Sequence, residues 1–402
     1  MNRMTRRRFL AFSGVTAAGA LAFGATRVNW DDLMSAAVHD PLDPKAGVLV
    51  VVTLYGGNDG LNTVVPASDH AYQDARPDLA YKPEEVLDLG DGLGLNPGMK
   101  GLKGLWDGQG LAIVRGVGYP TPDHSHFRSM AIWQTASPKS SVPTGWLGRW
   151  LDATGANPLH ALSVEPVLPP MLAGAQTAAA SFPLGGLALP KGQLGEAFAM
   201  LGKPVTGEEP WQARAAKSIA DLHEAVKVFG AHSGKTDKTS KTGALAGQLD
   251  LVASLIEAGV PTRAYSVSLG GFDTHADERG TQQRLLTELD GALTKFVERM
   301  KKTDRGKQAV VLVYSEFGRR VKANASDGTD HGTAGPVFVL GDKVKHGFFG
   351  AQPSLSDLDN GDLKQTTDFR DVYATVLADV LGTDPGKVLP DHSGRVDGLF
   401  TA

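Results

Sequence analysis

Short apolar runs alternate along the chain with segments of helical periodicity. Residues 48–54 (VLVVVTL) are almost all apolar or β-branched and lead into a glycine-rich loop, which is typical of a strand buried on both faces. Further short apolar runs occur at residues 111–114, 264–269, 310–314 and 337–340. Because helical segments alternate with these runs, the pattern predicts an α/β fold with a doubly wound, mostly parallel sheet flanked by helices.

Two amphipathic helices are predicted beside these strands. The first lies between the runs at 264–269 and 310–314, where apolar residues recur at spacings of three and four: Leu286, Leu289, Leu293, Phe296 and Met300. The second is expected from about residue 368 to residue 381, because Gly382 and Pro385 follow its apolar face. We expect each helix to pack its apolar side on the sheet.

We expect a single α/β domain over residues 38–402, with an inserted helical or cap region at about 138–258. Proline, alanine and glycine are frequent between residues 138 and 190, and helical segments follow, interrupted by the polar stretch 233–241. No domain linker is evident after residue 38. The sequence therefore favours one large domain with an insertion over two separate domains.

The N-terminal segment has the composition of an export signal. Three arginines, Arg6 to Arg8, are followed at once by Phe9 and Leu10 and then by an uncharged stretch rich in alanine and glycine. This order resembles a twin-arginine signal, so residues 1–37 are expected to be a signal peptide and a short linker. The uncharged stretch is shorter than the ~20 residues that span a bilayer, which favours cleavage over a permanent membrane anchor. We therefore expect a periplasmic or extracellular protein whose partner during export is the twin-arginine translocase.

The composition narrows the function further. With 42% hydrophobic and 21% charged residues, the chain resembles an ordinary globular protein. Lys plus Arg number 40 against 44 Asp plus Glu, so no general basic field exists for nucleic acid, which we do not expect as a partner. Cysteine is absent, which excludes disulfides and thiolate ligands and leaves any metal with nitrogen or oxygen ligands.

Carboxylates and an imidazole follow two of the predicted strands, where ligands bind in open α/β sheets. Asp59 follows the first strand in a Gly-Gly-Asn-Asp-Gly loop, where it either serves a site or supports the turn through the local backbone. Asp273 and His275 follow the strand at 264–269. The Asp-x-His spacing puts both side chains on one side of an extended segment, so they either share a metal or form a loop ion pair.

A serine between two imidazoles is the candidate nucleophile. Ser125 lies between His124 and His126 at the start of a predicted helix, with Arg128 three residues later. One interpretation is a helix N-cap. The other is a nucleophile whose anionic target is held by the N–H groups of the helix N-terminus and by Arg128.

Two further segments can reach the same rim of the sheet. Glu316 and Arg319 follow the strand at 310–314, and His331 precedes the strand at 337–340. Arg319 is either a surface charge or a clamp for an oxyanion. Among the remaining histidines, His392 in a Pro-Asp-His-Ser stretch is the first candidate for a further role.

Six motifs together resemble the exported bacterial family known as domain of unknown function 1501. They are LVVVTLYGGNDGLNTVVP, SHFRSMAIWQT, GGFDTHAD, SEFGRRV, GTDHGTAGPVFVLG and TTDFRDVYATVL, and they extend in order over nearly all of the mature chain. That family is similar to the alkaline phosphatase and sulfatase superfamily of metal-dependent phosphate and sulfate ester hydrolases. The resemblance therefore implies an alkaline-phosphatase-like sheet and a metal centre.

The resemblance also implies roles for particular residues. Asp59 would bind one metal, Asp273 and His275 would bind the other, and His331 would supply a further ligand. Ser125 would be the nucleophile. The sequence departs from the superfamily where an Asp-His pair is expected after the strand at 310–314, because Glu316 can replace the carboxylate but the next residue is a phenylalanine. A two-metal mechanism is therefore in doubt.

The resulting hypothesis is an exported hydrolase of a small anionic ester, phosphate or sulfate. It would use one or two divalent ions, zinc, manganese or calcium, held by Asp59, Asp273, His275, Glu316 and His331. Ser125 would attack, His124 or His126 would move protons, and Arg128 or Arg319 would hold the oxyanion. The alternative is a non-catalytic secreted scaffold or binding protein that works with another exported protein.

Overall fold

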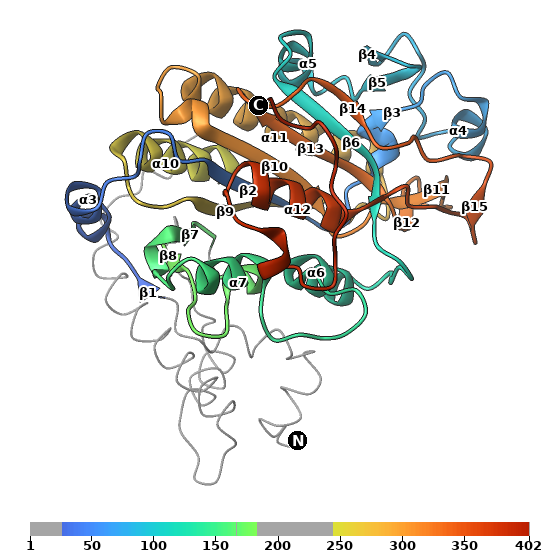
Figure 1. The fold of residues 1–402 in the computed structure, drawn as a ribbon. Coiled ribbons are helices and arrows are strands. Elements are labelled where there is room, and N and C mark those ends of the chain that lie inside the picture. The colour runs from blue at the N-terminus through green and yellow to red at the C-terminus, as the bar shows by residue number, and fades with distance from the viewer. Residues whose placement is uncertain (1–25, 166, 183–243, 402) are drawn as a thin grey trace, which may run out of the picture.

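A mostly parallel sheet of ten strands forms the centre of the protein (Figure 1). The computed structural model describes residues 26–165, 167–182 and 244–401. The strands lie in the order β1-β8-β7-β9-β2-β10-β13-β6-β14, and β17 also pairs with β6. Neighbouring strands run parallel except at β13, which is antiparallel to both β10 and β6. The sheet strands are β1 (Thr26–Arg27), β2 (Val48–Tyr55), β6 (Leu111–Gly118), β7 (Ala161–Ser163), β8 (Ala180–Ser181), β9 (Ala264–Gly270), β10 (Ala309–Ser315), β13 (Gly335–Gly341), β14 (Gly347–Phe349) and β17 (Thr367–Asp368).

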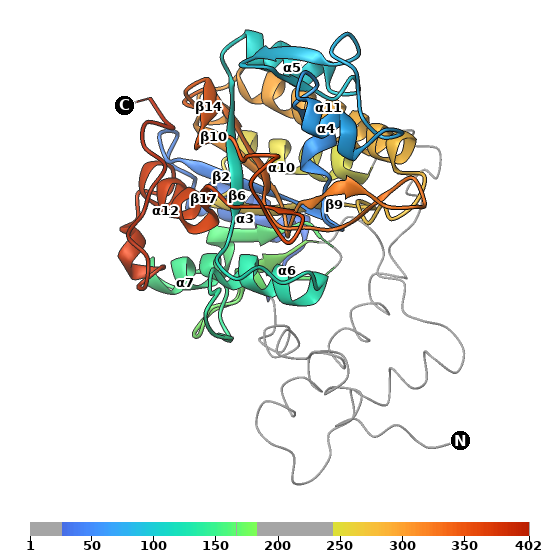
Figure 2. The same cartoon turned by 90° about the vertical axis from the view of Figure 1, so that its right-hand side faces the viewer.

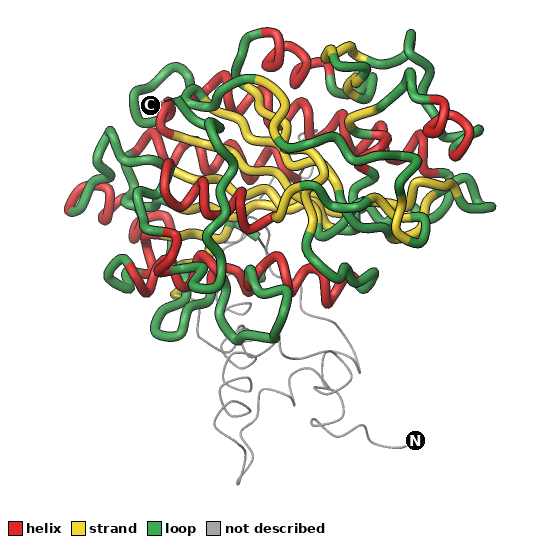
Figure 3. The backbone as a smooth tube through the Cα atoms, turned by 45° about the vertical axis from the view of Figure 1, so that its right-hand side comes forward, coloured by secondary structure: helices red, strands yellow, loops and turns green. Residues whose placement is uncertain are grey.

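Helices cover both faces of this sheet, so the predicted α/β fold class is confirmed (Figure 3). On one side lie α3 (Trp30–His39), α5 (Lys100–Asp107), α10 (Ala244–Ala258) and α11 (Glu278–Met300). On the other side lie α6 (His126–Thr135), α7 (Trp146–Ala153) and α12 (Phe369–Asp379). Figure 2 shows α6 and α7 below the sheet and α5 and α11 above it.

Strand β2 carries apolar side chains on both of its faces because both faces are buried. Alternate side chains point to opposite faces of a strand. Val50 and Val52 therefore pack in the core beneath α10 and α11, whereas Leu49 and Val51 pack in the core beneath α12. Both cores exclude water, so a strand of alternating polar and apolar residues would not fit this position.

The two predicted helices are present with nearly the predicted bounds. In α11 the predicted stripe is buried: Leu286, Leu289, Leu293, Phe296 and Met300. Helix α12 begins at Phe369 because Asp368 accepts a hydrogen bond from the N–H of Arg370. Strands β7 and β8 lie within the range predicted as an insertion, but they extend the central sheet.

Smaller elements gather beyond one edge of the sheet. They are β3 (Val64–Val65), β4 (Leu87–Gly90), β5 (Leu93–Leu95), α4 (His70–Ala75), the hairpin of β11 (Arg319–Ala323) and β12 (Thr329–His331), and the pair β15 (Leu358–Asp359) and β16 (Asp362–Leu363). Short 3-10 turns are η1 (Gly60–Asn62), η2 (Pro158–His160), η3 (Pro170–Leu172), η4 (Gly306–Gln308) and η5 (Pro385–Lys387). The hairpin β11–β12 connects β10 to the antiparallel β13 and appears at the right-hand side of Figure 1.

Part of the predicted organisation lies outside the described residues. This holds for most of the predicted signal segment, residues 1–25, and for residues 183–243 of the predicted insertion. Among the residues that the structure does describe, no helix combines the length and hydropathy needed to cross a bilayer.

Candidate functional site

The topology brings several distant segments to one rim of the sheet. Strands β2, β6, β9 and β10 run in the same direction, so their carboxyl ends share one edge. Asp273 and His275 follow β9, Glu316 follows β10 and His126 begins α6 after β6. Because β13 runs the opposite way, its first residue also lies at this edge, and His331 precedes it closely.

Three imidazoles converge on one carboxylate oxygen at this rim. The Nε2 atoms of His126, His275 and His331 lie 3.3, 3.0 and 3.2 Å from Oδ1 of Asp273. The Nε2 atoms of His275 and His331 are 2.9 Å apart. Ligand atoms of His126, Asp273 and His331 all lie within 4.8 Å of one another. We call these four side chains, Asp273 with its three imidazoles, the histidine cluster.

The opposite ring nitrogens of the three histidines face acceptors. Nδ1 of His126 is 2.9 Å from Oε1 of Glu316, and Nδ1 of His331 is 2.7 Å from the carbonyl oxygen of His124. Nδ1 of His275 lies 3.4 Å from Oδ1 of Asp330. A carbonyl or carboxylate can only accept, so Nδ1 of His126 and Nδ1 of His331 donate to these acceptors, and each neutral ring then has its lone pair on Nε2.

This arrangement has the donor groups that could hold a metal ion. Nitrogen lone pairs and a carboxylate oxygen that face one point repel one another unless a proton or a metal cation lies between them. Nε2 of His126 is buried and makes no hydrogen bond. A buried polar atom without a partner is costly and calls for an explanation, and a metal ion at this point supplies one.

The charge states of Asp273 and His331 favour the same interpretation. Burial raises the pKa of Asp273, but the hydrogen bond and charge of Arg319, together with the neighbouring His331 ring, outweigh burial and bring the pKa to about 2. Asp273 is therefore ionised at neutral pH. Burial lowers the pKa of His331, which favours the neutral imidazole that a metal requires. The pKa of His126 is raised, mainly by the hydrogen bond to Glu316, so a metal ion must compete with a proton at this ring.

Glu316 lies behind the cluster and orients it. Its Oε1 accepts hydrogen bonds from the N–H of Gly56 and from Nδ1 of His126, each at 2.9 Å, and its Oε2 accepts one from Ser315. The predicted role of Glu316 as a metal ligand is therefore corrected, because both oxygens already accept hydrogen bonds, one of them from His126 itself. His126 is predicted from the sequence to move protons. In the structure its Nε2 faces Oδ1 of Asp273 in the cluster.

Asp59 is engaged by an arginine. The Arg76 guanidinium donates to both of its oxygens, at 2.5 and 3.0 Å, and both side chains are fully buried. Oδ1 of Asp59 also caps the turn at Leu61. The predicted metal-binding role of Asp59 is corrected for this reason: a buried guanidinium supplies the positive charge that a metal ion would otherwise supply.

Arg319 connects the backbone segments that carry the cluster. It is buried and donates to the carbonyl oxygens of Gly56, Gly57, Phe272 and Thr329 as well as to Oδ1 of Asp273. Arg319 therefore joins three separate loops and fixes Asp273. Neither a surface charge nor an oxyanion clamp describes this guanidinium, because it is fully buried and each of its nitrogens already donates a hydrogen bond within the protein.

The serine and its neighbours lie at the first turn of α6. Ser125 is exposed and is the N-cap residue, yet its hydroxyl makes no capping hydrogen bond. Nε2 of His124 is 2.9 Å from Oδ2 of Asp362, and this imidazole is half-exposed. Arg128, the third residue of α6, is half-buried. His392 is paired separately with Asp371 on α12 at 2.7 Å.

Three side chains of the site were not predicted from the sequence. Asp330 and Asp362 approach His275 and His124, and the ring of Phe317 packs at 4.9 Å from His126 and 4.8 Å from His331. Asp330 stands beside His331 in the Gly-Thr-Asp-His-Gly stretch and could have been found there. Asp362 follows no predicted strand, so the sequence held no signal for it.

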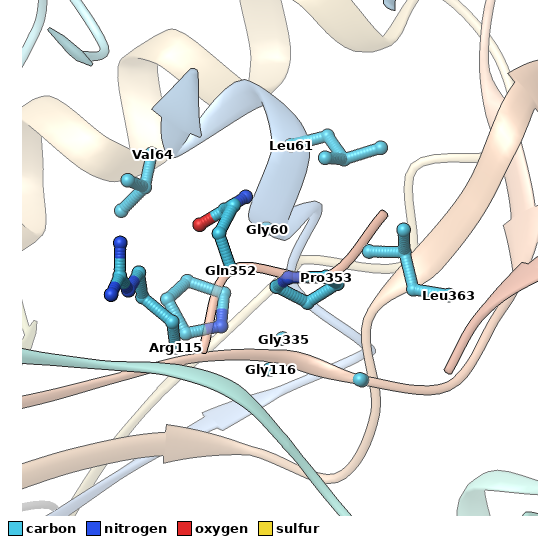
Figure 4. A pocket seen from close by; sticks show the side chains of 11 residues that line it. Gly60, Leu61, Val64, Arg115, Gly116, Gly335, Gln352, Pro353 and Leu363 are labelled. Atoms are coloured by element: carbon cyan, nitrogen blue, oxygen red, sulfur yellow. The ribbon is translucent and has the colours of Figure 1, made fainter. Parts of the chain in front are cut away.

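Two pockets flank the cluster. One of about 430 Å³ is lined by His124, Phe317, Arg320 and Asp362, and one of about 350 Å³ is lined by His126 and other residues of α6. A third, shown in Figure 4, has only about 30 Å³ between Gly60, Arg115 and Pro353. That volume holds little more than a water molecule, so only the first two can admit a substrate.

Comparison with known proteins supports the family suggested by the sequence. Residues 205–400 match the model of the family described as "Protein of unknown function (DUF1501)". A search of the curated proteins found no match. The matched range includes the third to sixth of the sequence motifs, which contain Asp273, Glu316 and His331.

The chain is also similar, at low sequence identity, to several solved structures. A protein in the alkaline phosphatase superfamily from Vibrio parahaemolyticus is 12% identical, with 94% of this chain and 80% of that chain covered and a TM-score of 0.41. Murine ectonucleotide pyrophosphatase/phosphodiesterase 5 in complex with AMP is 9% identical, with coverage of 87% and 97% and a TM-score of 0.42. The C-terminal periplasmic domain of EcEptC from Escherichia coli, in complex with Zn, is 9% identical, with coverage of 74% and 74% and a TM-score of 0.37. At such scores the functional assignment depends on the geometry of the site.

Proposed function

We propose that the protein is an exported, metal-dependent hydrolase of small phosphate or sulfate esters. The observation that carries this proposal is the convergence of three Nε2 atoms on Oδ1 of Asp273, with each Nδ1 turned toward an acceptor. Outer acceptors of this kind fix the tautomer and orientation of metal-binding histidines. Electrostatic repulsion within the set would be relieved by a bound cation.

The donor set favours zinc, with manganese as the next choice. Imidazole nitrogen and carboxylate oxygen suit zinc, whereas calcium prefers ligands that are all oxygen. A single ion is favoured, because the two carboxylates that would bind a second ion have other partners. Asp59 is paired with Arg76, and Glu316 accepts a hydrogen bond from His126. When bound, such an ion polarises the ester and lowers the pKa of an oxygen nucleophile.

The residues around the cluster suit the remaining steps of ester hydrolysis. In this proposal the Ser125 oxygen forms a bond to phosphorus or sulfur as the bond to the ester oxygen breaks. His124, oriented by Asp362, accepts the hydroxyl proton and returns it to the departing alcohol. Water then releases the acid from Ser125. Arg128 holds the negative charge of the substrate at the helix N-terminus.

A screen of chromogenic phosphate and sulfate esters, with zinc or manganese added, tests this proposal. Turnover is expected in the full chain, and Ser125→Ala should reduce it by at least 100-fold, the low end of the ~10²–10⁴ range for loss of one catalytic group. Metal content should be unchanged in this variant. Equal turnover in Ser125→Ala would remove Ser125 from the mechanism, and no turnover of any ester would contradict the hydrolase proposal.

A non-catalytic scaffold or binding protein is the second candidate. The observations that favour it are Phe317, which packs against two cluster imidazoles, and the Arg76 guanidinium on Asp59. Both occupy places where a two-metal hydrolase would present ligands. Metal bound at the cluster without turnover of any ester would support this scaffold.

A further inference from the structure

A pocket of about 350 Å³ opens beside the histidine cluster on the side of α6. Its walls come from α6, from the segment 141–145, from Pro170 in η3 and from Tyr55 at the end of β2. His126 and Glu316 belong both to this wall and to the site described above. We call this space the α6 pocket. A ligand bound at the cluster can therefore extend directly into it.

Apart from its inner end, the α6 pocket is lined largely by apolar side chains. These are Phe127, Met130, Ala131, Val142, Pro143 and Pro170. Tyr55 adds an aromatic ring whose hydroxyl donates to Oε2 of Glu165 at 3.3 Å. Glu165 is buried and lies outside the lining of the pocket. An apolar wall of this kind binds apolar groups by removing their surface from water.

Phe127 gives a second, independent indication of an apolar occupant. It is 84% exposed, the highest value among the four exposed large apolar side chains of the described residues. The other three, Trp30, Val38 and Val167, do not line this pocket. An exposed aromatic ring at an apolar pocket is typical of a binding surface.

One cationic side chain lies in the same wall. Arg128 and the inner end of the pocket at the cluster together suit a ligand with a negative charge at one end. The volume is at the low end of the range for small-molecule sites and suits a group of one or two rings. Size, lining and charge therefore describe one compound with an anionic end and an apolar end.

We propose that the α6 pocket binds the aromatic or branched-alkyl group of the anionic ester whose charged end lies at the histidine cluster. This inference rests on the proposed function and names its substrate class as esters of apolar alcohols. The pocket of about 430 Å³ on the other side is lined by His124, Arg320, Asp362 and Lys364. A sugar-like or polyanionic ester would prefer that polar pocket, so the two pockets predict different substrates.

Binding of 1-naphthol to the full, chelator-treated chain tests the pocket without any metal or turnover. We expect saturable binding, measured by fluorescence. Ala131→Phe should fill the pocket and weaken binding at least fivefold. Phe127→Ser should weaken it comparably, whereas Val38→Ser, which removes a 76% exposed apolar side chain elsewhere, should leave it unchanged. Non-saturable binding, or equal binding in all four proteins, would overturn the inference.

Hydrolysis separates the failure of this inference from the failure of the proposed function. The metal-loaded chain should prefer 1-naphthyl phosphate to methyl phosphate and to glycerol phosphate, and Ala131→Phe should remove that preference. An unchanged preference in Ala131→Phe would reject the α6 pocket while the hydrolase proposal stands. Saturable naphthol binding without turnover of any ester would reject the hydrolase and its ester class, while the pocket remains an apolar binding site.

Discussion

At the scale of single residues, the proposed metal position depends on groups that do not themselves face it. Glu316 fixes the ring of His126, Arg319 fixes Asp273, and the carbonyl of His124 fixes His331. Such outer groups keep the lone pairs on Nε2 aimed at one point, so they set metal affinity without touching the ion.

Glu316→Ala should therefore weaken metal binding. Loss of the acceptor at Nδ1 of His126 frees the ring to rotate, and we expect a roughly 10- to 100-fold loss of affinity. Competition with a metal chelator measures this change. Glu316→Gln, which keeps an acceptor oxygen, is the matched control and should lose less. If the alanine variant retained full affinity, Glu316 would have no orienting role.

At the scale of elements, the hairpin β11–β12 carries His331 and packs closely on the segment that carries Asp273 and His275. A Cβ at Gly332 would lie 2.4 Å from the backbone carbonyl carbon of Arg319, and one at Gly328 would lie 2.3 Å from that of His275. Distances this short leave no room for a side chain. Gly328 therefore lets the hairpin approach the segment that carries His275, and Gly332 lets the end of β12 lie close to β11 beside His331.

Gly332→Ala should push the chain after β12 away from β11 and with it displace His331. We expect a loss of about 1–3 kcal/mol in the free energy of unfolding, as for other overpacked sites, together with weaker metal binding. Urea titration with chelator competition measures both quantities. Gly104→Ala in α5 has no atom within 4 Å of the added Cβ and should be neutral or slightly stabilising. Equal stability of the two variants would show that the hairpin tolerates a shift.

The buried pair of Arg76 and Asp59 joins α4, η1 and β11. Arg76 also donates to the carbonyl oxygens of Arg320 and Val321 on β11. Arg76→Ala leaves the Asp59 carboxylate buried without its cation, so we expect about 3–5 kcal/mol of destabilisation in urea titrations. Removal of both partners, as in Arg76→Met with Asp59→Leu, should recover much of that loss. If the single variant were as stable as the double variant, the pair would not support the fold.

The sequence predicted elements better than contacts. Strands such as 48–54 and the stripe of α11 could be found because burial on both faces, or on one helical face, imposes an apolar period. Likewise, Asp273, His275 and His331 follow or precede strands that share an edge. The role of Asp59 could not be predicted, because its partner Arg76 lies in a separate short helix and no periodicity links the two.

At the scale of the whole molecule, the stability should depend on pH through a buried carboxyl near the site. Burial, and then the neighbouring Asp59, raises the pKa of Glu278 to about 9, and its Oε2 accepts a hydrogen bond from Thr329. The folded chain keeps a proton that the unfolded chain releases above the ordinary pKa of a glutamic acid. This contribution to stability is therefore complete below that ordinary value and is lost as the pH rises toward 9.

Glu278→Gln mimics the protonated acid and should remove this dependence. Between pH 6 and 9 the wild-type protein should lose up to about 1.4 kcal/mol per pH unit relative to the variant, as one proton per molecule requires. Urea titrations at several pH values measure both curves. Parallel curves would show that Glu278 is ionised in the folded protein.

The central claim is that the histidine cluster binds a metal ion, and elemental analysis of the purified full chain tests it most directly. We expect one zinc or manganese ion per chain, lost in His331→Ala while the circular dichroism spectrum is unchanged. His392→Ala, which removes a histidine paired with Asp371 instead, should keep the ion. A chain that takes up neither metal and unfolds at the same temperature with and without chelator would contradict the account.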